Sequence, residues 1–362
     1  MIKALMIVRS TFYTSRGGDT IQVLQTAAHL AAHRICVDIK LTSEKIEYDQ
    51  YDLLHFFNIT RPADILYHIR KAKKPFFVST ILIDYSEYDK YHRKGPAGML
   101  FRFLTADSIE YMKTISRWLL GKDRLVSYEY IWKGQRRAII DILQHASLLL
   151  PNSHSEYRRL IEQYHCPADH MVIPNGVDTS LFAFNKSVEK DPLMVLCVAR
   201  IEGIKNQLNL IRALRNTQFN LFIIGTAAIN QTSYYQECRQ LASGNIQFIE
   251  HLPQEELVSY YQKAKVHALP SWFETTGLSS LEAAAMGCNI VITDKGDTRE
   301  YFGTDASYCD PASPESIFNS VQKAATMSNN GLLLQKIHMQ YSWEQATVRT
   351  IEAYKSVKHI WH

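Results

Sequence analysis

The sequence predicts an α/β protein made of two doubly wound domains, each with a parallel sheet that helices cover on both faces. Three observations favour this fold class. The 362 residues suffice for two domains of ordinary size. Short apolar runs alternate with helical patterns in both halves of the chain, as in successive βαβ units. Between the two series, residues 173–178 contain Pro and Asn-Gly, which are typical of a turn at a domain junction.

The first series occupies the N-terminal half. Strands are expected at 2–8, 36–41, 53–57, 76–81 and 147–150, with helices at 21–32, 65–73 and 155–164. An insertion rich in Tyr, Trp, Lys and Arg, residues 85–135, interrupts this series before the alternation resumes at 138–143. The second series has expected strands at 193–198, 221–224, 246–249, 266–269 and 290–293, separated by helices at 207–214, 234–241, 255–264 and 281–286.

Two such domains facing each other would define a cleft. In doubly wound folds ligands bind at the carboxyl ends of the strands, so we expect the functional residues there.

Composition excludes several classes of protein. Hydrophobic residues make up 46% and charged residues 21%, which excludes a disordered or low-complexity chain. The net charge of +4 is too small for a nucleic-acid-binding protein. The six cysteines form no Cys-x-x-Cys pair, which favours reduced, buried thiols of a cytoplasmic protein. No run approaches the roughly 18 apolar residues of a membrane span, and the N-terminal apolar run is too short for a signal peptide.

The most informative segment is 270–287, which follows a strand, passes through a loop and opens a helix. Backbone amides of Thr276, Gly277 and Leu278 would lie near the helix N-terminus, which favours an anion there. Glu274 stands among Trp, Phe and Thr, where an unpaired carboxylate is costly to bury, although a solvated loop position is the alternative. For Glu282 the alternative is a capping box with Ser279. Carboxylates beside an anion site suit a sugar nucleotide.

The pair Glu274 and Glu282, with seven residues between them, resembles the E-x7-E motif of the retaining glycosyltransferases of family 4. Other segments are similar to that family over almost the whole chain. They are Gly17-Gly18 as its glycine loop, Ala199-Arg200 and Lys205-Asn206 as its basic pair, 174–178 as its interdomain segment and Ser342-Trp343-Glu344 as the start of its final helix. The resemblance implies the GT-B fold, two Rossmann-like domains that face each other across a cleft.

The resemblance also implies roles for residues. Glu282 would bind the ribose hydroxyls, and Glu274 with the amides of Thr276, Gly277 and Leu278 would engage the donor sugar and its phosphate. Arg200 and Lys205 would neutralise the departing diphosphate, so that no metal is expected. No Asp-x-Asp metal signature occurs in the chain. Gly17 and Gly18 would let the first loop approach the phosphate.

The same resemblance assigns the domains. Residues 1–172 would form the acceptor-side domain, which contains the insertion, and helix 343–362 would pack back onto it. Residues 177–341 would form the nucleotide-sugar donor domain. The nucleobase would lie near 248–252, where His251 is a candidate contact. Glu250 replaces the usual glycine there, which leaves the base open.

The N-terminal half departs from the family in one respect. Relatives often carry a histidine after the strand at 76–81, and this sequence has none. Asn58, Ser79 and Asp84 are the polar candidates for the acceptor side. Asp84 would act as a base or orient the acceptor hydroxyl, or it would only cap a helix. His55 is expected to be a hydrogen-bonded core residue.

The insertion combines nine Lys and Arg residues with apolar positions such as Met99, Phe103, Trp118 and Leu119. Such a pattern suits either a helix lying on an anionic membrane, which fits a lipid-linked acceptor, or a helix packed on the N-terminal domain. The protein is therefore expected in the cytoplasm, either free or peripheral on the inner face of the membrane.

These expectations describe a metal-independent retaining hexosyltransferase-type enzyme. It would move a sugar from a nucleotide-diphosphate sugar to a hydroxyl of a glycan or lipid-linked saccharide, as in cell-surface polysaccharide biosynthesis. Two alternatives remain open: a sugar-nucleotide epimerase or phosphorylase on the same fold, and a non-catalytic sugar-nucleotide-binding subunit. A dehydrogenase is disfavoured because Gly17-Gly18 lacks the G-x-G-x-x-G spacing.

Overall fold

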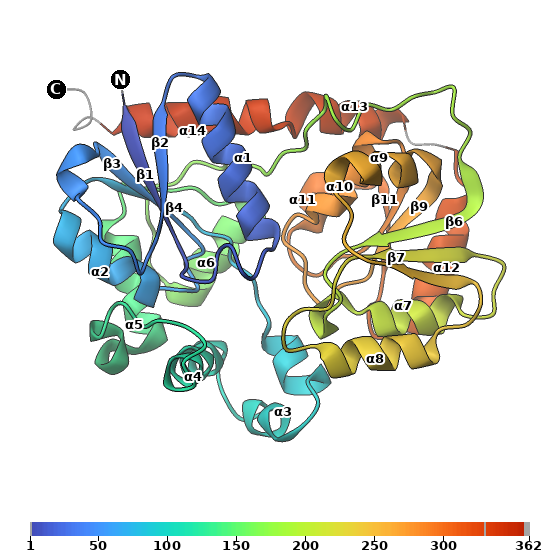
Figure 1. The fold of residues 1–362 in the computed structure, drawn as a ribbon, viewed down its shortest axis with the longest axis horizontal. Coiled ribbons are helices and arrows are strands. Elements are labelled where there is room, and N and C mark those ends of the chain that lie inside the picture. Colours follow the sequence, from blue (N-terminus) through green and yellow to red (C-terminus); the bar gives the residue numbers. More distant parts are fainter. Residues whose placement is uncertain (1, 329–330, 358–362) are drawn as a thin grey trace. The chain divides into compact units, whose positions relative to one another are not determined.

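The computed structural model describes residues 2–328 and 331–357, which divide into two compact units (Figure 1). Unit 1 comprises residues 2–86, 99–175 and 343–357, and unit 2 comprises residues 87–98, 176–328 and 331–342. Each unit holds one parallel sheet, which confirms the predicted α/β fold with two doubly wound sheets. Residues 358–362 of the predicted final helix lie outside the described residues.

The sheet of unit 1 has five strands in the order β2-β1-β3-β4-β5, and all neighbours are parallel. Their bounds are β1 Lys3–Val8, β2 Cys36–Leu41, β3 Leu53–Phe57, β4 Phe76–Ser79 and β5 Leu148–Leu149. Strand β1 is buried from Ala4 to Val8 because helices cover both faces of the sheet, and this explains its unbroken apolar sequence.

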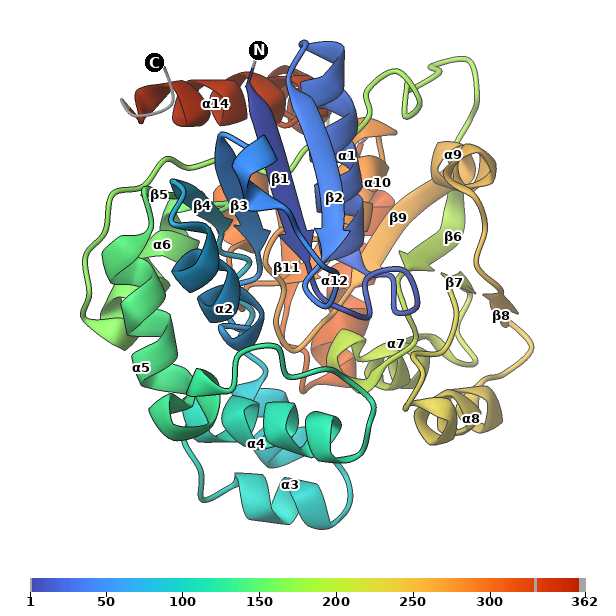
Figure 2. The same ribbon diagram turned by 60° about the vertical axis from the view of Figure 1, so that its left-hand side comes forward.

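Helices pack on both faces of this sheet (Figure 2). On one face the core is formed with α2 (Ala63–Ala72), α5 (Glu129–His145) and α6 (His154–Tyr164). On the other face α1 (Gly18–Ala32) lies beside α14 (Trp343–Ser356). Buried His55 of β3 is hydrogen-bonded to the Tyr354 hydroxyl of α14 at 2.7 Å and to Ser79 Oγ at 2.9 Å, so it is a core residue, as expected.

The insertion forms a π-helical turn (Tyr88–His92), α3 (Pro96–Phe101), α4 (Ala106–Leu119) and the start of α5. The sequence placed all of it with the first domain, but Glu87–Gly98 belongs to unit 2. The physical reason is that Glu87, Tyr88 and His92 contact residues of unit 2. Only part of the amphipathic pattern packs on unit 1. Ile109 is buried and Trp118 is partly buried against the core, whereas Phe103 is 88% exposed.

The sheet of unit 2 has six parallel strands in the order β11-β10-β9-β6-β7-β8. Their bounds are β6 Asp191–Val198, β7 Asn220–Ile224, β8 Ile246–Ile249, β9 Ala264–Leu269, β10 Asn289–Thr293 and β11 Ala306–Cys309. The first five strands match the predicted runs within two residues. Edge strand β11 was not predicted, because three of its four residues are only partly buried and give no apolar run.

Two layers of helices enclose this sheet. One core contains side chains of α9 (Gln254–Lys263), α10 (Leu278–Ala285), α11 (Thr298–Phe302) and α13 (Gly331–Gln340). The other core contains side chains of α7 (Gln207–Leu214), α8 (Thr232–Leu241) and α12 (Pro314–Thr326). Helix α12 begins where Ser313 Oγ accepts from the Ser316 amide at 3.1 Å and Pro314 occupies the first turn.

All six cysteines are free thiols, in agreement with the sequence. Four are buried, but Cys36 is exposed because it opens edge strand β2, which corrects the expectation that all are buried. Within the described ranges no helix is both long and apolar enough to span a membrane.

Candidate functional site

Two predicted site residues of unit 2 form a direct ion pair. Strand β6 ends at Val198, and a short 3₁₀ turn at Gly203–Lys205 follows. The Lys205 Nζ lies 2.6 Å from Oε2 of Glu274, which follows strand β9. Ser271 Oγ donates to the same oxygen at 3.0 Å. The pair therefore joins the carboxyl ends of two neighbouring strands, the edge where a parallel sheet binds ligands.

The backbone of Glu274 is fixed by the loop after β10. Its amide donates to the Lys295 carbonyl at 3.1 Å, and its carbonyl accepts from the Asp297 amide at 3.0 Å. Gly296 between them has φ +105, and a Cβ there would clash with the Glu274 carbonyl oxygen. Only glycine fits this close approach. The sequence did not single out Gly296, because nothing local links it to Glu274.

The helix after Glu274 starts three residues earlier than the predicted 281–286. Helix α10 begins at Leu278, and Gly277 at its N-cap has φ +71. The first N–H groups of a helix lack intrahelical acceptors, so the amides near Gly277 and Leu278 suit a negatively charged group. Thr276, just before the N-cap, is buried.

Glu282 lies on the buried face of α10. Its Oε2 accepts from the Tyr261 hydroxyl at 2.9 Å and its Oε1 from Gln254 Nε2 at 3.1 Å. The alternative of a capping box with Ser279 is wrong, because the N-cap is Gly277. Burial raises the pKa of Glu282 to about 7, although the two hydrogen bonds oppose this rise. No pattern in the sequence pointed to Tyr261 or Gln254 of α9, which donate these two hydrogen bonds.

The remaining predicted residues of unit 2 are more accessible. Arg200 follows β6, its side chain is 38% exposed, and its guanidinium lies 2.8 Å from Glu202. His251 is exposed in the loop between β8 and α9. Lys205, Glu274 and Glu282 are thus held by specific partners. Arg200 is partly exposed and paired with Glu202, and His251 is exposed.

Unit 1 places the acceptor-side candidates in local hydrogen bonds. Asn58, at φ +72, accepts with Oδ1 from the amide and hydroxyl of Thr60 at 3.0 and 2.5 Å. Ser79 contacts buried His55. Asp84 is exposed, and its Oδ1 accepts from the Ser86 amide at 2.8 Å, the contact of a turn or helix cap. The capping alternative for Asp84 thus has a contact in the structure.

The predicted glycine loop also lies in unit 1. Gly17 is the N-cap of α1 and Gly18 is its first residue. In the first turn, Asp19 pairs with Arg9, which follows β1, at 2.8 Å. Arg9 also donates to carbonyls of the connecting loop, including that of Ser15 at 2.6 Å. The loop between β1 and α1 is therefore folded around the Arg9 side chain.

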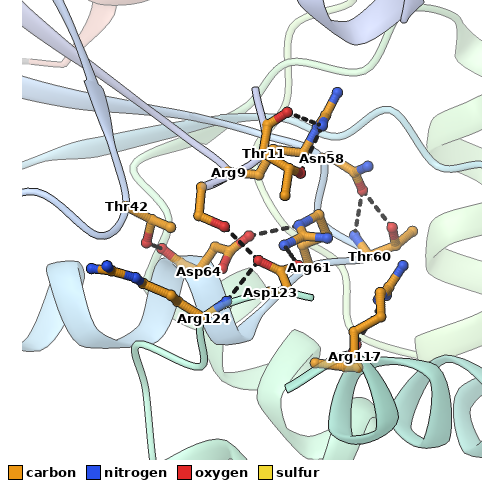
Figure 3. Close-up of polar contacts among 12 residues, drawn as sticks. Arg9, Thr11, Thr42, Asn58, Thr60, Arg61, Asp64, Arg117, Asp123 and Arg124 are labelled. Carbon is orange, nitrogen blue, oxygen red and sulfur yellow. Dashed lines mark hydrogen bonds and ion pairs between the residues drawn. The ribbon is translucent and has the colours of Figure 1, made fainter. Parts of the chain in front are cut away.

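A charged cluster that the sequence did not reveal lies beside the strand ends of unit 1 (Figure 3). Arg61 donates to Asp64 at 2.6 Å and to Asp123 at 2.7 Å, and Asp123 also accepts from Ser10 Oγ at 2.5 Å. Because Asp123 follows α4, these bonds fasten the insertion to the loops after β1 and β3. Among the described residues, the buried Nε of nearby Arg117 has no hydrogen-bond partner. Burial, aided by the Arg61 charge, lowers the pKa of Arg117.

Within the described part of the chain, no three His, Cys, Asp or Glu side chains gather as metal ligands would.

Comparison with solved structures identifies the class of fold. The chain superposes on sucrose-phosphate synthase of Thermosynechococcus elongatus with a TM-score of 0.76, at 15% identity, over 98% of this chain and 99% of the other. It superposes on Anabaena HepE in complex with UDP-glucose with a TM-score of 0.70, at 17% identity, over 98% and 100%. The two parallel sheets, of five and six strands, match the GT-B fold of glycosyltransferase structures.

The sequence comparison is more specific for unit 2. Residues 179–334 match the model of the family described as glycosyl transferases group 1. The D-inositol 3-phosphate glycosyltransferase of Corynebacterium aurimucosum is 27% identical over 77% of this chain and 75% of its own length. The O-antigen chain mannosyltransferase B of Escherichia coli is 25% identical over 60% and 63%. Lys205, Glu274 and Glu282 all lie inside the matched range.

Proposed function

We propose that the protein is a retaining glycosyltransferase that moves a sugar from a nucleotide-diphosphate sugar to a hydroxyl group of an acceptor, without a metal ion. The observation that carries this proposal is the buried carboxylate pair inside the range that matches the group 1 family. Glu274 lies against Lys205, and Glu282 faces inward from α10, which starts at Gly277. A ligand with hydroxyls beside a diphosphate matches carboxylates beside a helix N-terminus.

Each residue has a distinct part in this proposal. Glu282, held by Tyr261 and Gln254, would accept hydrogen bonds from the two ribose hydroxyls. Glu274 would orient the donor sugar, and the amides of Thr276, Gly277 and Leu278 would receive its phosphate. His251 would contact the base.

Arg200 and Lys205 would stabilise the diphosphate as it leaves. In the ligand-free chain both cations lie beside carboxylates, Glu202 and Glu274. A departing diphosphate gains negative charge in the transition state, and fixed cations stabilise that charge more than they stabilise the intact donor. Because two cations would supply this charge, the proposal needs no metal ion. EDTA should leave transfer unchanged.

A thermal-shift panel tests the donor site. UDP-, GDP-, ADP- and dTDP-glucose are added in EDTA to the wild type, to Glu282→Ala and to Glu256→Ala, which removes an exposed carboxylate of α9. A ligand at about 100 times its Kd stabilises by roughly 2.7 kcal/mol. One donor should stabilise the wild type and Glu256→Ala but not Glu282→Ala. Equal stabilisation of all three proteins would refute the ribose assignment.

Retention is tested separately by the anomeric configuration of the product. With the donor that the panel selects, NMR of the first transferred sugar should show the configuration of the donor. An inverted product would contradict the retaining mechanism while leaving the donor site intact.

We propose that the acceptor is a lipid-linked saccharide or a glycan at an anionic membrane surface. Large apolar side chains of the insertion and the start of α5 are exposed, next to exposed cations such as Arg102 and Lys122. They are Met99, Leu100, Phe103, Leu119, Leu120, Tyr128 and Trp132. Exposed apolar side chains together with exposed cations suit binding to the interface of a membrane that contains anionic lipids.

Vesicle co-sedimentation tests this surface. Vesicles of phosphatidylcholine with about 30% phosphatidylglycerol should sediment the wild type and the control Ile229→Ser, whose side chain is also exposed but lies in unit 2. The double variant Phe103→Ser/Trp132→Ser should stay in the supernatant. If both variants sediment equally, the surface does not bind membranes.

A second candidate function is a non-catalytic sugar-nucleotide-binding subunit. It is favoured by the hydrogen bonds that all three acceptor-side candidates, Asn58, Ser79 and Asp84, form within the chain. In that case the panel would show a bound donor, and no transfer to any acceptor would follow. Transfer by the wild type to any acceptor would exclude this second function. Asp84→Ala then tests Asp84 alone, because it should lower turnover without weakening donor binding only if Asp84 takes part in transfer.

A further inference from the structure

The inference concerns residues 87–98, a segment of the insertion that belongs to unit 2 although the chain on both sides of it belongs to unit 1. The segment is cyan in Figure 1. We call it the strap. It holds its own shape, because Arg93 pairs with buried Asp89 at 2.7 Å and the Arg93 amide donates to the Tyr88 carbonyl at 2.8 Å. It is thus an ordered element with its own internal contacts.

Three side chains of the strap contact three loops of unit 2. The His92 ring stacks on the Trp272 ring, with centroids 3.5 Å apart and planes 16° from parallel. Glu87 forms an ion pair with Lys295. The Tyr88 hydroxyl lies so close to Gly203 that a Cβ there would overlap it.

Those three loops are the ones that hold the Lys205–Glu274 pair. Gly203 opens the turn that ends at Lys205, and Trp272 lies two residues before Glu274. The Lys295 carbonyl accepts from the Glu274 amide, and the Trp272 amide donates to the Ile204 carbonyl at 2.9 Å. The strap therefore contacts every loop that fixes this ion pair. A further contact with unit 2 joins Lys94 to Glu237 of α8 at 2.6 Å, outside these three loops.

We propose that the strap is a positioning element of the donor site: by packing on Trp272, Gly203 and Lys295 it fixes the geometry of Lys205 and Glu274. This inference rests on the proposed function for its consequence, since these two residues would engage the sugar and diphosphate. Glu282 takes its partners from α9, which none of these strap contacts reaches. The strap should therefore govern the sugar-diphosphate part of the site and not the ribose part.

The first test needs no ligand. Hydrogen–deuterium exchange is measured in the wild type, in His92→Ala and in the control Tyr91→Ala, whose side chain is 63% exposed on the same turn. His92→Ala should speed exchange in peptides covering 203–206, 271–276 and 294–297 by about tenfold, the scale of one lost aromatic pair. Tyr91→Ala should change none of them, and His92→Phe should restore slow exchange. Unchanged exchange in His92→Ala and in Tyr88→Ala would overturn the inference.

The second test measures binding of UDP-glucose and of uridine by calorimetry. His92→Ala should weaken UDP-glucose binding about tenfold while uridine binds as it does to the wild type. Equal weakening of both ligands would refute a role confined to the sugar-diphosphate part. If the wild type binds neither ligand but the exchange result holds, UDP-glucose is not the donor. The strap then remains a positioning element of these loops.

Discussion

At the scale of single residues, Glu282 has the most unusual environment of the predicted site. Burial destabilises the ionised form of a carboxylate that has no cation beside it. In Glu282 burial raises the pKa to about 7. If Glu282 accepts hydrogen bonds from two ribose hydroxyls, as proposed, its ionised form suits this role better, because protonation turns one of its oxygens into a donor.

Donor binding should therefore depend on pH through Glu282. Below pH 7 a proton must leave before the ribose binds, so the Kd for UDP-glucose should be about tenfold higher at pH 6 than at pH 8. UDP-glucose suits this measurement because it lacks the titrating terminal phosphate of UDP. Calorimetry at several pH values measures the slope. In Glu282→Gln the slope should vanish, and an unchanged slope would place the titrating group elsewhere.

The raised pKa of Glu282 also determines how the free energy of unfolding changes with pH. The folded chain binds a proton at Glu282 more tightly than the unfolded chain, whose carboxyl titrates near 4.5. The stability that this group contributes is therefore full below pH 4.5 and is lost as pH rises to about 7. Ligand-free Glu282→Gln should lack that loss in thermal unfolding scans.

At the scale of elements, the cluster around Arg61 determines how the insertion is attached to unit 1. Arg61 is shared between Asp64 and Asp123, and the side chains of Arg61 and Asp123 are 17% and 10% exposed. Removing one charge of such a buried pair leaves the other charge incompletely compensated.

Asp123→Asn should therefore lower the free energy of unfolding by about 2 kcal/mol, since a buried guanidinium loses one charged partner. Urea denaturation followed by circular dichroism measures this change. The matched control is Glu47→Gln, which removes the ion pair between Lys45 and Glu47. Their side chains are 91% and 65% exposed, so this variant should change the urea midpoint of unfolding very little. Equal effects of the two variants would show that the Arg61 cluster carries no special stability.

The elements that could be predicted are those with a strong local pattern. Strands β2, β3 and β8 and helix α7 have the predicted bounds, because each apolar run or periodic face is bounded by polar or turn-forming residues. Edge strand β11 is mostly half-buried and has no such run. The strap could not be predicted, since its place depends on contacts of Tyr88 and His92 with residues more than 100 positions away.

The residues of the candidate site also divide into those with a local sequence pattern and those without one. Lys205, Glu274, Gly277 and Glu282 could be named from the motif and from the strand–loop–helix pattern around them. Their partners Tyr261, Gln254 and Gly296 come from other elements and leave no local signal. The acceptor side was the least predictable part, because Asn58 and Asp84 are found in turn-type hydrogen bonds that occur in any loop.

At the scale of the whole molecule, both units are discontinuous in sequence. The chain passes from one unit to the other after Ser86, Gly98, Asn175 and Ser342. A fragment that starts at Gly176 therefore lacks the strap, and a fragment that ends at Asn175 lacks α14. Isolated halves would be unsuitable for measuring the donor or acceptor sites.

Helix α14 should be essential to unit 1. Tyr354 is fully buried, donates or accepts the hydrogen bond with His55, and packs on Phe77 with ring centroids 5.0 Å apart. Tyr354→Ala should lower the free energy of unfolding by about 3 kcal/mol, as for other large buried aromatic side chains. Thermal and urea unfolding measure it, with Val348→Ala on the exposed side of the same helix as the control. A similar small loss in both variants would mean that α14 is dispensable.

The position of α14 also has a consequence for the order of events during synthesis. Its residues 343–356 cover the face of the first sheet that contains His55 and Phe77. The ribosome makes all of unit 2 before it makes this helix, so the part of this face that α14 covers, next to α1, stays exposed on the nascent first sheet until residues 176–342 have been made. Chaperones that bind apolar surface would meet the chain during that interval, and unit 2 can finish folding before unit 1 does.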